Sequence, residues 1–288
     1  MKRIVLSALL MLLLFAVLGA RADMNGAGFS VQAILPQQQI DKKAGYFYVR
    51  TEPEQEQVLK VLIRNKSEEA IVVDIAANSA FTGASGMIDY SGKREDEGGF
   101  AAMVTIADAQ MNIPAKQSAV AEFIVRMPQE SFTGEVLGGL VFTKSSKEDS
   151  ADEGKVMAIT HTFNYCIAVR LVQGDIASIQ PELALEGVRL IQVAGFPALN
   201  IAIRNQSPII VENVRMDVWR IDDKGQTAIP LLKGGQITLA PLKQMDYVLL
   251  PDENGLPAGE NERIVVTLQS EESSWRFENE GLQHAENN

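Results

Sequence analysis

A five-residue phrase occurs twice in the chain, as IRNKS at residues 63–67 and as IRNQS at residues 203–207. Solenoid repeats recur every 20–50 residues or so, and these copies are much further apart. A single domain commonly spans about 100–150 residues, which matches the spacing of the two copies. The repeat therefore predicts two similar domains in tandem.

Each copy ends a segment in which apolar residues alternate with other residues. The inward positions of the first segment would be Leu59, Val61 and Ile63, and those of the second Leu199, Ile201 and Ile203. Period-two alternation is typical of a strand with one buried face. We therefore expect Leu62 and Arg64 to be more exposed than Val61 and Ile63.

The asparagine of each copy suits the end of a strand. Its side chain can bond backbone two residues further on, and the serine offers a second local backbone bond. We expect Asn65 and Asn205 to lie at equivalent strand ends. A second echo, NIPAKQSAVAEF at 112–123 and TLAPLKQMDYVL at 238–249, shares P-x-K-Q.

Short runs rich in β-branched and aromatic residues fill both halves, separated by Gly, Pro, Asn and Asp. The strands expected from them are 29–35, 46–51, 57–65, 70–78, 103–107, 118–127, 135–143, 156–172, 197–205, 207–221, 235–250 and 261–269. The sequence therefore predicts an all-β fold with two tandem immunoglobulin-like antiparallel β-sandwiches.

The N-terminus has the pattern of a secretory signal peptide. Lys2 and Arg3 precede an apolar run over 4–18, and Ala20 and Ala22 form an A-x-A site. We expect cleavage after Ala22 and an exported protein. The alternative is an uncleaved anchor, although a spanning helix needs about 20 apolar residues.

The rest of the chain divides at a polar segment, KSSKEDSADEGK, at 144–155. The expected organisation is a signal peptide over 1–22, one sandwich over 23–150 and a second over 151–288. The alternative interpretation of the polar segment is a long hairpin loop inside one domain.

Composition excludes several classes of protein. The formal charge of −11 disfavours nucleic acid, since phosphates would repel the chain. The single cysteine, Cys166, permits no intrachain disulfide, and its apolar run predicts a small buried side chain. The chain has only two tryptophans, Trp219 and Trp275. For Trp219 two interpretations stay open, a core residue and an anchor on a binding surface.

The sequence offers no catalytic constellation. His161 and His284 are the two histidines, and neither has a metal-ligand spacing. There is no G-x-S-x-G elbow, P-loop or G-x-G-x-x-G after a strand. The acidic clusters at 94–99 and 147–154 lack EF-hand spacing and are expected to be solvated loops. We therefore expect no catalytic, cofactor or metal site and no enzyme activity. A cell-wall hydrolase, with two placed carboxylates, is the enzymatic alternative.

Two motifs have further interpretations. The sequences NKS and NQS, which begin at Asn65 and Asn205, also match N-glycosylation sites. The paired Gly138 and Gly139 between β runs predict a bulge or a close backbone approach.

Several segments resemble the WxL-interacting surface proteins of Gram-positive bacteria. They are 29–49, 74–91, 127–142, 161–171, 199–211 and 240–249. The resemblance implies a first domain that associates with peptidoglycan and a second that contacts host or extracellular ligands, including host matrix proteins. It also implies action beside WxL-domain proteins at the cell wall or cell surface, and no catalytic residues. A two-sandwich chaperone for exported subunits is the alternative function.

The chain departs from that family in one respect. Family members continue into a C-terminal membrane helix, whereas no apolar run follows Leu268 here. The sequence therefore predicts no C-terminal membrane anchor. Three alternatives stay open: the protein is released and held by its partners, the signal run stays as an anchor, or the reading frame is shortened.

Overall fold

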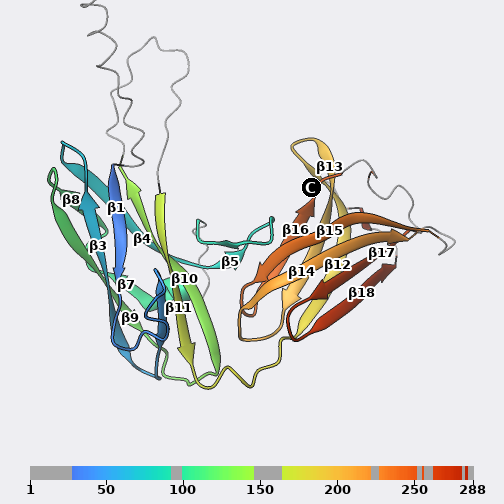
Figure 1. Cartoon of the computed structure of the whole chain (residues 1–288), viewed down its shortest axis with the longest axis horizontal. Coiled ribbons are helices and arrows are strands. Elements are labelled where there is room, and N and C mark those ends of the chain that lie inside the picture. Colours follow the sequence, from blue (N-terminus) through green and yellow to red (C-terminus); the bar gives the residue numbers. More distant parts are fainter. Residues whose placement is uncertain are drawn as a thin grey trace, which may run out of the picture.

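The computed structural model describes residues 28–91, 99–145, 164–221, 227–251, 255, 262–280 and 283–284. It contains two β-sandwiches that lie side by side (Figure 1). The expected all-β fold is confirmed. The signal peptide expected over 1–22 lies outside the described residues.

The first sandwich packs a four-stranded sheet against a five-stranded sheet. The four-stranded sheet is ordered β1-β3-β9-β7, with β1 Phe29–Ile34, β3 Glu56–Asn65, β9 Ser118–Arg126 and β7 Val104–Ile106. The other is ordered β2-β11-β10-β4-β8, with β2 Phe47–Arg50, β11 Asn164–Gln173, β10 Gly134–Lys144, β4 Ile71–Ser79 and β8 Gln110–Ile113. A hairpin of β5 Phe81–Thr82 and β6 Ile88–Asp89, and one helical turn, α2 Phe100–Met103, follow β4.

The second sandwich has two four-stranded sheets. One is ordered β16-β13-β12-β19, with β16 Gln244–Leu249, β13 Phe196–Asn205, β12 Leu183–Val193 and β19 Gln283–His284. The other is ordered β15-β14-β17-β18, with β15 Ala228–Leu239, β14 Val211–Ile221, β17 Arg263–Gln269 and β18 Ser274–Glu280.

The two sandwiches repeat one topology. The order β1-β3-β9 in the first corresponds to β12-β13-β16 in the second, and β11-β10-β4-β8 corresponds to β18-β17-β14-β15. Each has its own apolar core, one around Leu59, Phe123 and Phe142 and the other around Ile201, Val218 and Val266. The predicted duplication is therefore visible in the strand order.

The predicted register of β3 is confirmed. Val61 and Ile63 are fully buried, Leu62 is half-buried and Arg64 is exposed. The expected segment 235–250 is two strands, because the chain turns after Leu239 and β16 starts at Gln244. The structure also adds β8, β12 and β18, which the sequence patterns did not predict.

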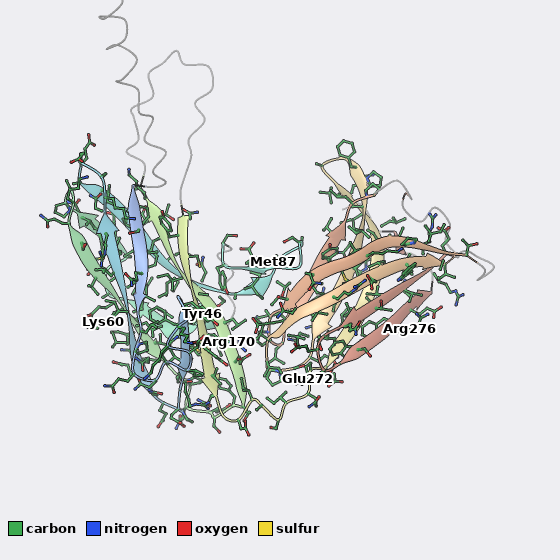
Figure 2. All side chains as sticks on the ribbon, in the orientation of Figure 1. Tyr46, Lys60, Met87, Arg170, Glu272 and Arg276 are labelled. Carbon is green, nitrogen blue, oxygen red and sulfur yellow. The ribbon has the colours of Figure 1, made fainter. Side chains whose placement is uncertain are left out.

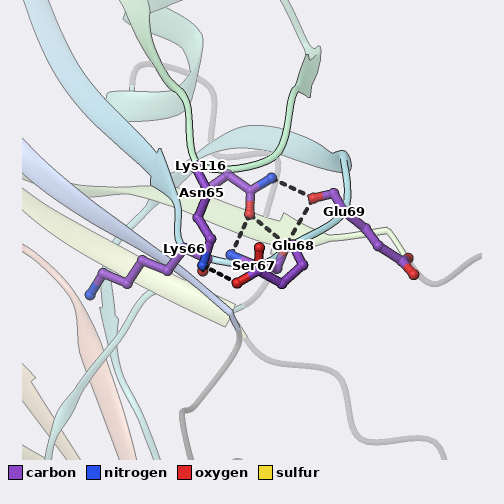
Figure 3. Close-up of polar contacts among 6 residues, drawn as sticks. All are labelled: Asn65, Lys66, Ser67, Glu68, Glu69 and Lys116. Atoms are coloured by element: carbon purple, nitrogen blue, oxygen red, sulfur yellow. Dashed lines mark hydrogen bonds and ion pairs between the residues drawn. The ribbon is translucent and has the colours of Figure 1, made fainter.

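Asn65 and Asn205 occupy the same position in the two sandwiches. The side-chain amide of Asn65 donates to the carbonyls of Glu69, Ile113 and Pro114 at 2.7, 3.0 and 3.1 Å. Its Oδ1 accepts from the backbone N–H of Ser67 at 2.9 Å. Figure 3 shows the part of this network that involves Glu69 and Ser67.

The Asn205 amide repeats the network on equivalent carbonyls. It donates to Ile209, Leu239 and Ala240 at 2.8, 3.3 and 3.1 Å, and Ser207 N donates to its Oδ1 at 3.0 Å. Each asparagine thus closes the joint between one sheet and the turn that enters the next strand.

This equivalence corrects the second sequence echo by one residue. Asn65 N bonds Gln117 O and Asn205 N bonds Lys243 O, each at 2.9 Å, so Gln117 matches Lys243. Positive φ angles of 58° at Lys116 and 55° at Leu242 agree with that register. The two P-x-K-Q sequences are therefore offset by one residue from the positions that are equivalent in the two sandwiches.

The polar segment 144–155 connects two strands of the first sandwich. β10 and β11 pair antiparallel from Gly134↔Gln173 to Thr143↔Asn164, and Ile167, Val169 and Leu171 of β11 lie in the first core. The range predicted for the second sandwich, 151–288, thus contains β11, a strand of the first sandwich. In the structure, the strands of the first sandwich end with β11 and those of the second begin with β12. The domain boundary between residues 150 and 151 stays a prediction.

Candidate functional site

A polar hollow of about 400 Å³ opens on the first sandwich between two loops that flank β2. Its lining residues are Gln37, Gln38, Gln39, Ile40, Arg50, Glu52 and Gln55. The first four follow β1, and the last two belong to the turn that enters β3. The hollow therefore combines amide, cationic and anionic side chains around one exposed apolar residue, Ile40.

The loop on one side of the hollow is held by a buried glutamine. Gln39 is 5% exposed, and its Nε2 donates to Asp41 O at 3.0 Å and to Tyr46 O at 2.9 Å. Tyr48 N donates to Gln39 Oε1 at 3.1 Å. Tyr46 is labelled in Figure 2. Because these bonds satisfy a buried amide, they fix the loop against β2.

The opposite wall is a hydrogen-bonded turn. Glu52 N donates to Gln55 Oε1 at 2.8 Å, and Gln55 N donates back to Glu52 O at 3.3 Å. Met127 N bonds Gln55 O at 3.0 Å, which ties the turn to β9. Both walls are thus ordered by the protein itself, and the polar ends of their other side chains remain at the surface.

A buried carboxylate joins the two sandwiches. The Glu135 side chain is fully buried, and its Oε1 accepts from Arg170 Nε at 2.5 Å. Its Oε2 accepts from Ile210 N of the second sandwich at 2.8 Å, and Arg170 Nη1 reaches Glu212 at 3.1 Å. Arg170 lies on the side of the first sandwich that faces the second (Figure 2). Burial opposes its charge, but the pKa of Arg170 is raised because Glu135 bonds and attracts it.

The β5–β6 hairpin of the first sandwich reaches the second (Figure 1). Thr82 Oγ1 donates to Thr238 O at 3.1 Å and accepts from Ala240 N at 2.9 Å. The backbone adds Thr238 N→Gly86 O at 2.8 Å and Val248 N→Ala84 O at 3.0 Å. A small apolar cluster closes the joint, with Ala80, Leu137, Ile88 and Tyr90 from the first sandwich and Ala240 and Ile210 from the second.

The second sandwich exposes apolar side chains at one end. The β12–β13 turn has positive φ at Ala194 and Gly195, and it leaves Val193 38% and Phe196 69% exposed. Leu250, 58% exposed, follows the end of β16, where Leu249 pairs with Leu199 of β13. These three residues are named here the apolar tip. Val193 and Phe196 are paired across the turn, and contiguous exposed apolar side chains mark contact surfaces.

The expectation of a buried Cys166 is wrong, because this residue is exposed. The inward positions of β11 are Ile167, Val169 and Leu171, so Cys166 lies on the opposite face. Its thiol is nevertheless shielded by neighbours: partial burial, with the charge of Asp89, raises its pKa to about 11. The thiol is therefore protonated at neutral pH and is a poor nucleophile.

The two tryptophans differ. Trp275 packs against the second core, whereas Trp219 is half-buried on the outer face of β14, with Lys233 Nζ 5.2 Å from its ring centroid. The core interpretation of Trp219 is therefore wrong.

The close backbone approach predicted for Gly138 and Gly139 is confirmed. A Cβ at Gly138 would clash with Phe100, and a Cβ at Gly139 would clash with Cys166 and Tyr90.

Other expectations concern residues that the structure does not describe. His161 and the acidic cluster 147–154 lie outside the described ranges, as does 94–99 apart from Gly99. Where the chain is described, no group of three His, Cys, Asp or Glu is placed to hold a metal ion. Within the same ranges, no helix combines the length and hydrophobicity needed to cross a bilayer. His284 lies in β19, whose backbone pairs with β12.

Comparison with known proteins places this two-sandwich binding protein in a family. The WxL Interacting Protein peptidoglycan binding domain matches residues 29–144, and the WxL Interacting Protein host binding domain matches residues 154–281. The chain belongs to the WxL Interacting Protein family. Its two domains are binding domains, and the family is one of the bacterial cell surface. No curated protein matches the sequence.

Several solved structures are similar to this chain at low sequence identity and low TM-score. A chaperone–tip adhesion subunit complex of Acinetobacter baumannii Csu pili is 11% identical, with TM-score 0.40, covering 90% of this chain and 100% of that chain. The Pseudomonas aeruginosa CupB2 chaperone is 12% identical, with TM-score 0.33 and coverage of 80% and 94%. The E. coli chaperone DraB is 14% identical, with TM-score 0.35 and coverage of 88% and 98%.

Sequence reasoning named no ligand-binding residue. The hollow and the apolar tip are the candidates that the structure adds. The run Gln37–Gln39 between two expected strands, and the Phe196 that follows Ala-Gly, were the available signals.

Proposed function

We propose that this protein is a non-enzymatic adaptor of the cell envelope. Its first sandwich binds peptidoglycan, and its second sandwich binds a protein partner, a WxL-domain surface protein or a host matrix protein. The observation that carries the proposal is the pair of family matches, each of which coincides with most of one sandwich.

The interdomain joint supports an adaptor with a fixed shape. Glu135 and Thr82 bond the second sandwich from fully or nearly fully buried positions. Breaking such contacts would leave buried polar groups unpaired, which costs about 1–3 kcal/mol per group. The two binding surfaces are therefore held at one spacing and orientation.

The peptidoglycan part of the proposal is tested by co-sedimentation. The purified full chain is mixed with insoluble peptidoglycan, and with cellulose as a polymer control. We expect the chain to sediment with peptidoglycan alone. If the chain stays in the supernatant in both cases, the proposed wall binding is rejected. A released or chaperone-like protein then becomes the favoured function.

For the second sandwich, the apolar tip is the surface we assign to the protein partner. Phe196→Ser removes its most exposed aromatic ring. Capture of a purified WxL-domain protein or of a host matrix protein should fall at least about tenfold, as for a typical aromatic anchor. Leu242→Lys is the matched control, since Leu242 is 59% exposed and corresponds to Lys116 in the first sandwich. Equal capture by wild type and both variants would exclude the tip.

A further inference from the structure

The polar hollow of the first sandwich suggests which part of the cell wall is recognised. We propose that it binds the peptide stems of peptidoglycan, through their carboxylate and ammonium groups, and that it does not bind the glycan chain. This inference rests on the proposed peptidoglycan binding and specifies the ligand chemistry of that site.

Arg50 is suited to a stem carboxylate. Its side chain is exposed at the end of β2, and within the described residues it makes one hydrogen bond, Nη1→Gly174 O at 3.3 Å. That bond orients the guanidinium and leaves its other N–H groups for a ligand. Guanidinium groups bind carboxylates with two parallel hydrogen bonds.

Glu52 and the glutamines complement the other groups of a peptide. Glu52 is exposed, and its carboxylate makes no hydrogen bond or ion pair with the described residues, so it can accept from an ammonium group. Gln37 and Gln38 are exposed amides, which can both donate to and accept from a peptide backbone. Peptide stems contain carboxylates, a diamino residue and backbone amides, and they match this set of groups.

The apolar content of the hollow also favours a peptide. The flat C–H face of a sugar ring is best covered by an aromatic ring, and the described lining includes none. Ile40, 40% exposed, is instead a small branched contact that suits the methyl groups of alanine side chains. The volume of about 400 Å³ lies at the small-ligand end of binding sites and has room for a short peptide.

The walls need little ordering when a ligand binds. The bonds of Gln39 hold one loop, and the reciprocal Glu52–Gln55 bonds hold the other. A preformed site retains more of its contact energy as affinity, because less conformational entropy is lost. The charged groups of Arg50 and Glu52 are therefore held by segments whose conformation is already fixed before a ligand binds.

The test uses the full chain, intact insoluble peptidoglycan and two soluble competitors. The competitors are the glycan strands that an amidase frees from their stems, and the stem peptides themselves. We expect the chain to sediment with intact peptidoglycan, and the free peptides, but not the glycan strands, to displace it. Arg50→Gln and Glu52→Gln should each weaken binding about tenfold, as for the loss of a charged hydrogen bond. Arg64→Gln and Glu130→Gln, exposed residues outside the hollow, should bind like wild type.

The outcomes separate this inference from the function beneath it. If wild type fails to sediment with intact peptidoglycan, the proposed wall binding itself is rejected. If stem-free glycan strands displace wild type and the stem peptides do not, or if both hollow variants bind intact peptidoglycan like wild type, the stem-peptide assignment is overturned and wall binding stands. Urea unfolding of each variant verifies that a lost interaction is not a lost fold.

Discussion

Asn65 and Asn205 bind equivalent backbone carbonyls in two sandwiches, and both are almost wholly buried, at 3% and 0% exposure. The repeated phrase in the sequence is therefore a repeated structural joint. The same burial disfavours N-linked glycosylation at either sequon, because the amide nitrogen that would be modified already donates to three carbonyls.

We predict that Asn65→Ala and Asn205→Ala each destabilise the protein by about 2–4 kcal/mol. Both leave several buried carbonyls and one N–H unsatisfied. Urea denaturation followed by tryptophan fluorescence and circular dichroism measures the change. Asn200→Ala, at a half-buried position on β13, is the control and should cost less than about 1 kcal/mol. Losses below that level at both motif asparagines would contradict the structural role.

Gly86→Ala should loosen the joint between the sandwiches. A Cβ at Gly86 would lie 2.4 Å from Ile237 Cγ2, and φ there is +81°. Gly195→Ala is the matched control, since φ is +83° and no atom lies within 4 Å of its Cβ. Small-angle X-ray scattering should show a larger radius of gyration for Gly86→Ala alone. Identical scattering from the two variants would refute a hairpin clamp.

Glu135→Gln should destabilise the protein by about 3 kcal/mol, because it leaves the mostly buried Arg170 without its main counter-charge. Glu122→Gln breaks an exposed pair with Lys60, each side chain 47% exposed, and should cost at most about 1 kcal/mol. Chemical denaturation of the two variants side by side makes the comparison. Similar losses from both would show that the buried pair contributes no more than a surface pair.

Cys166 should react slowly with iodoacetamide although it is exposed. Its pKa of about 11 leaves roughly a thousandth of the thiol ionised at pH 8. Alkylation followed by mass spectrometry should accelerate between pH 9 and 11, and unfolding in urea should abolish the protection. Fast labelling of the folded chain at pH 8 would contradict the raised pKa.

The raised pKa of Cys166 also makes the stability of the fold depend on pH. The neutral thiol favours the folded state at low pH, and that contribution declines as pH rises from about 9 through 11.

The sequence predicted the parts of the fold in which one face of a strand is buried without interruption. β3 alternates along its whole length and β13 alternates from Leu199 to Asn205, and their register was predicted from this. β12 was missed because a bulge between Leu185 and Gly187 resets the alternation. Cys166 was misplaced although its neighbours carried the information, since Ile167, Val169 and Leu171 already define the inward face.

The hollow was not predictable in the same way. Gln37 and Arg50 are separated in the chain and become neighbours because residues 38–40 pair antiparallel with residues 48–50, through the Gln39–Val49 bridge and the Arg50 N→Gln38 O bond. No local pattern in the sequence shows that the loop after β1 will pair with β2, and exposed glutamines have no periodicity. The apolar tip likewise follows from a two-residue turn, which determines that Phe196 is presented to solvent.

The β5–β6 hairpin has a consequence for how the chain reaches its native state. Thr82 and Thr238, 156 residues apart, are bonded, so the edge of β16 and the end of β15 are covered by a segment synthesised much earlier. Such long-range contacts form late and slowly. Expressed alone, the C-terminal half would present the unpaired backbone of Val248 as a template for other chains. We therefore expect the β5–β6 hairpin of the first sandwich to prevent self-association of the second sandwich by covering this backbone edge.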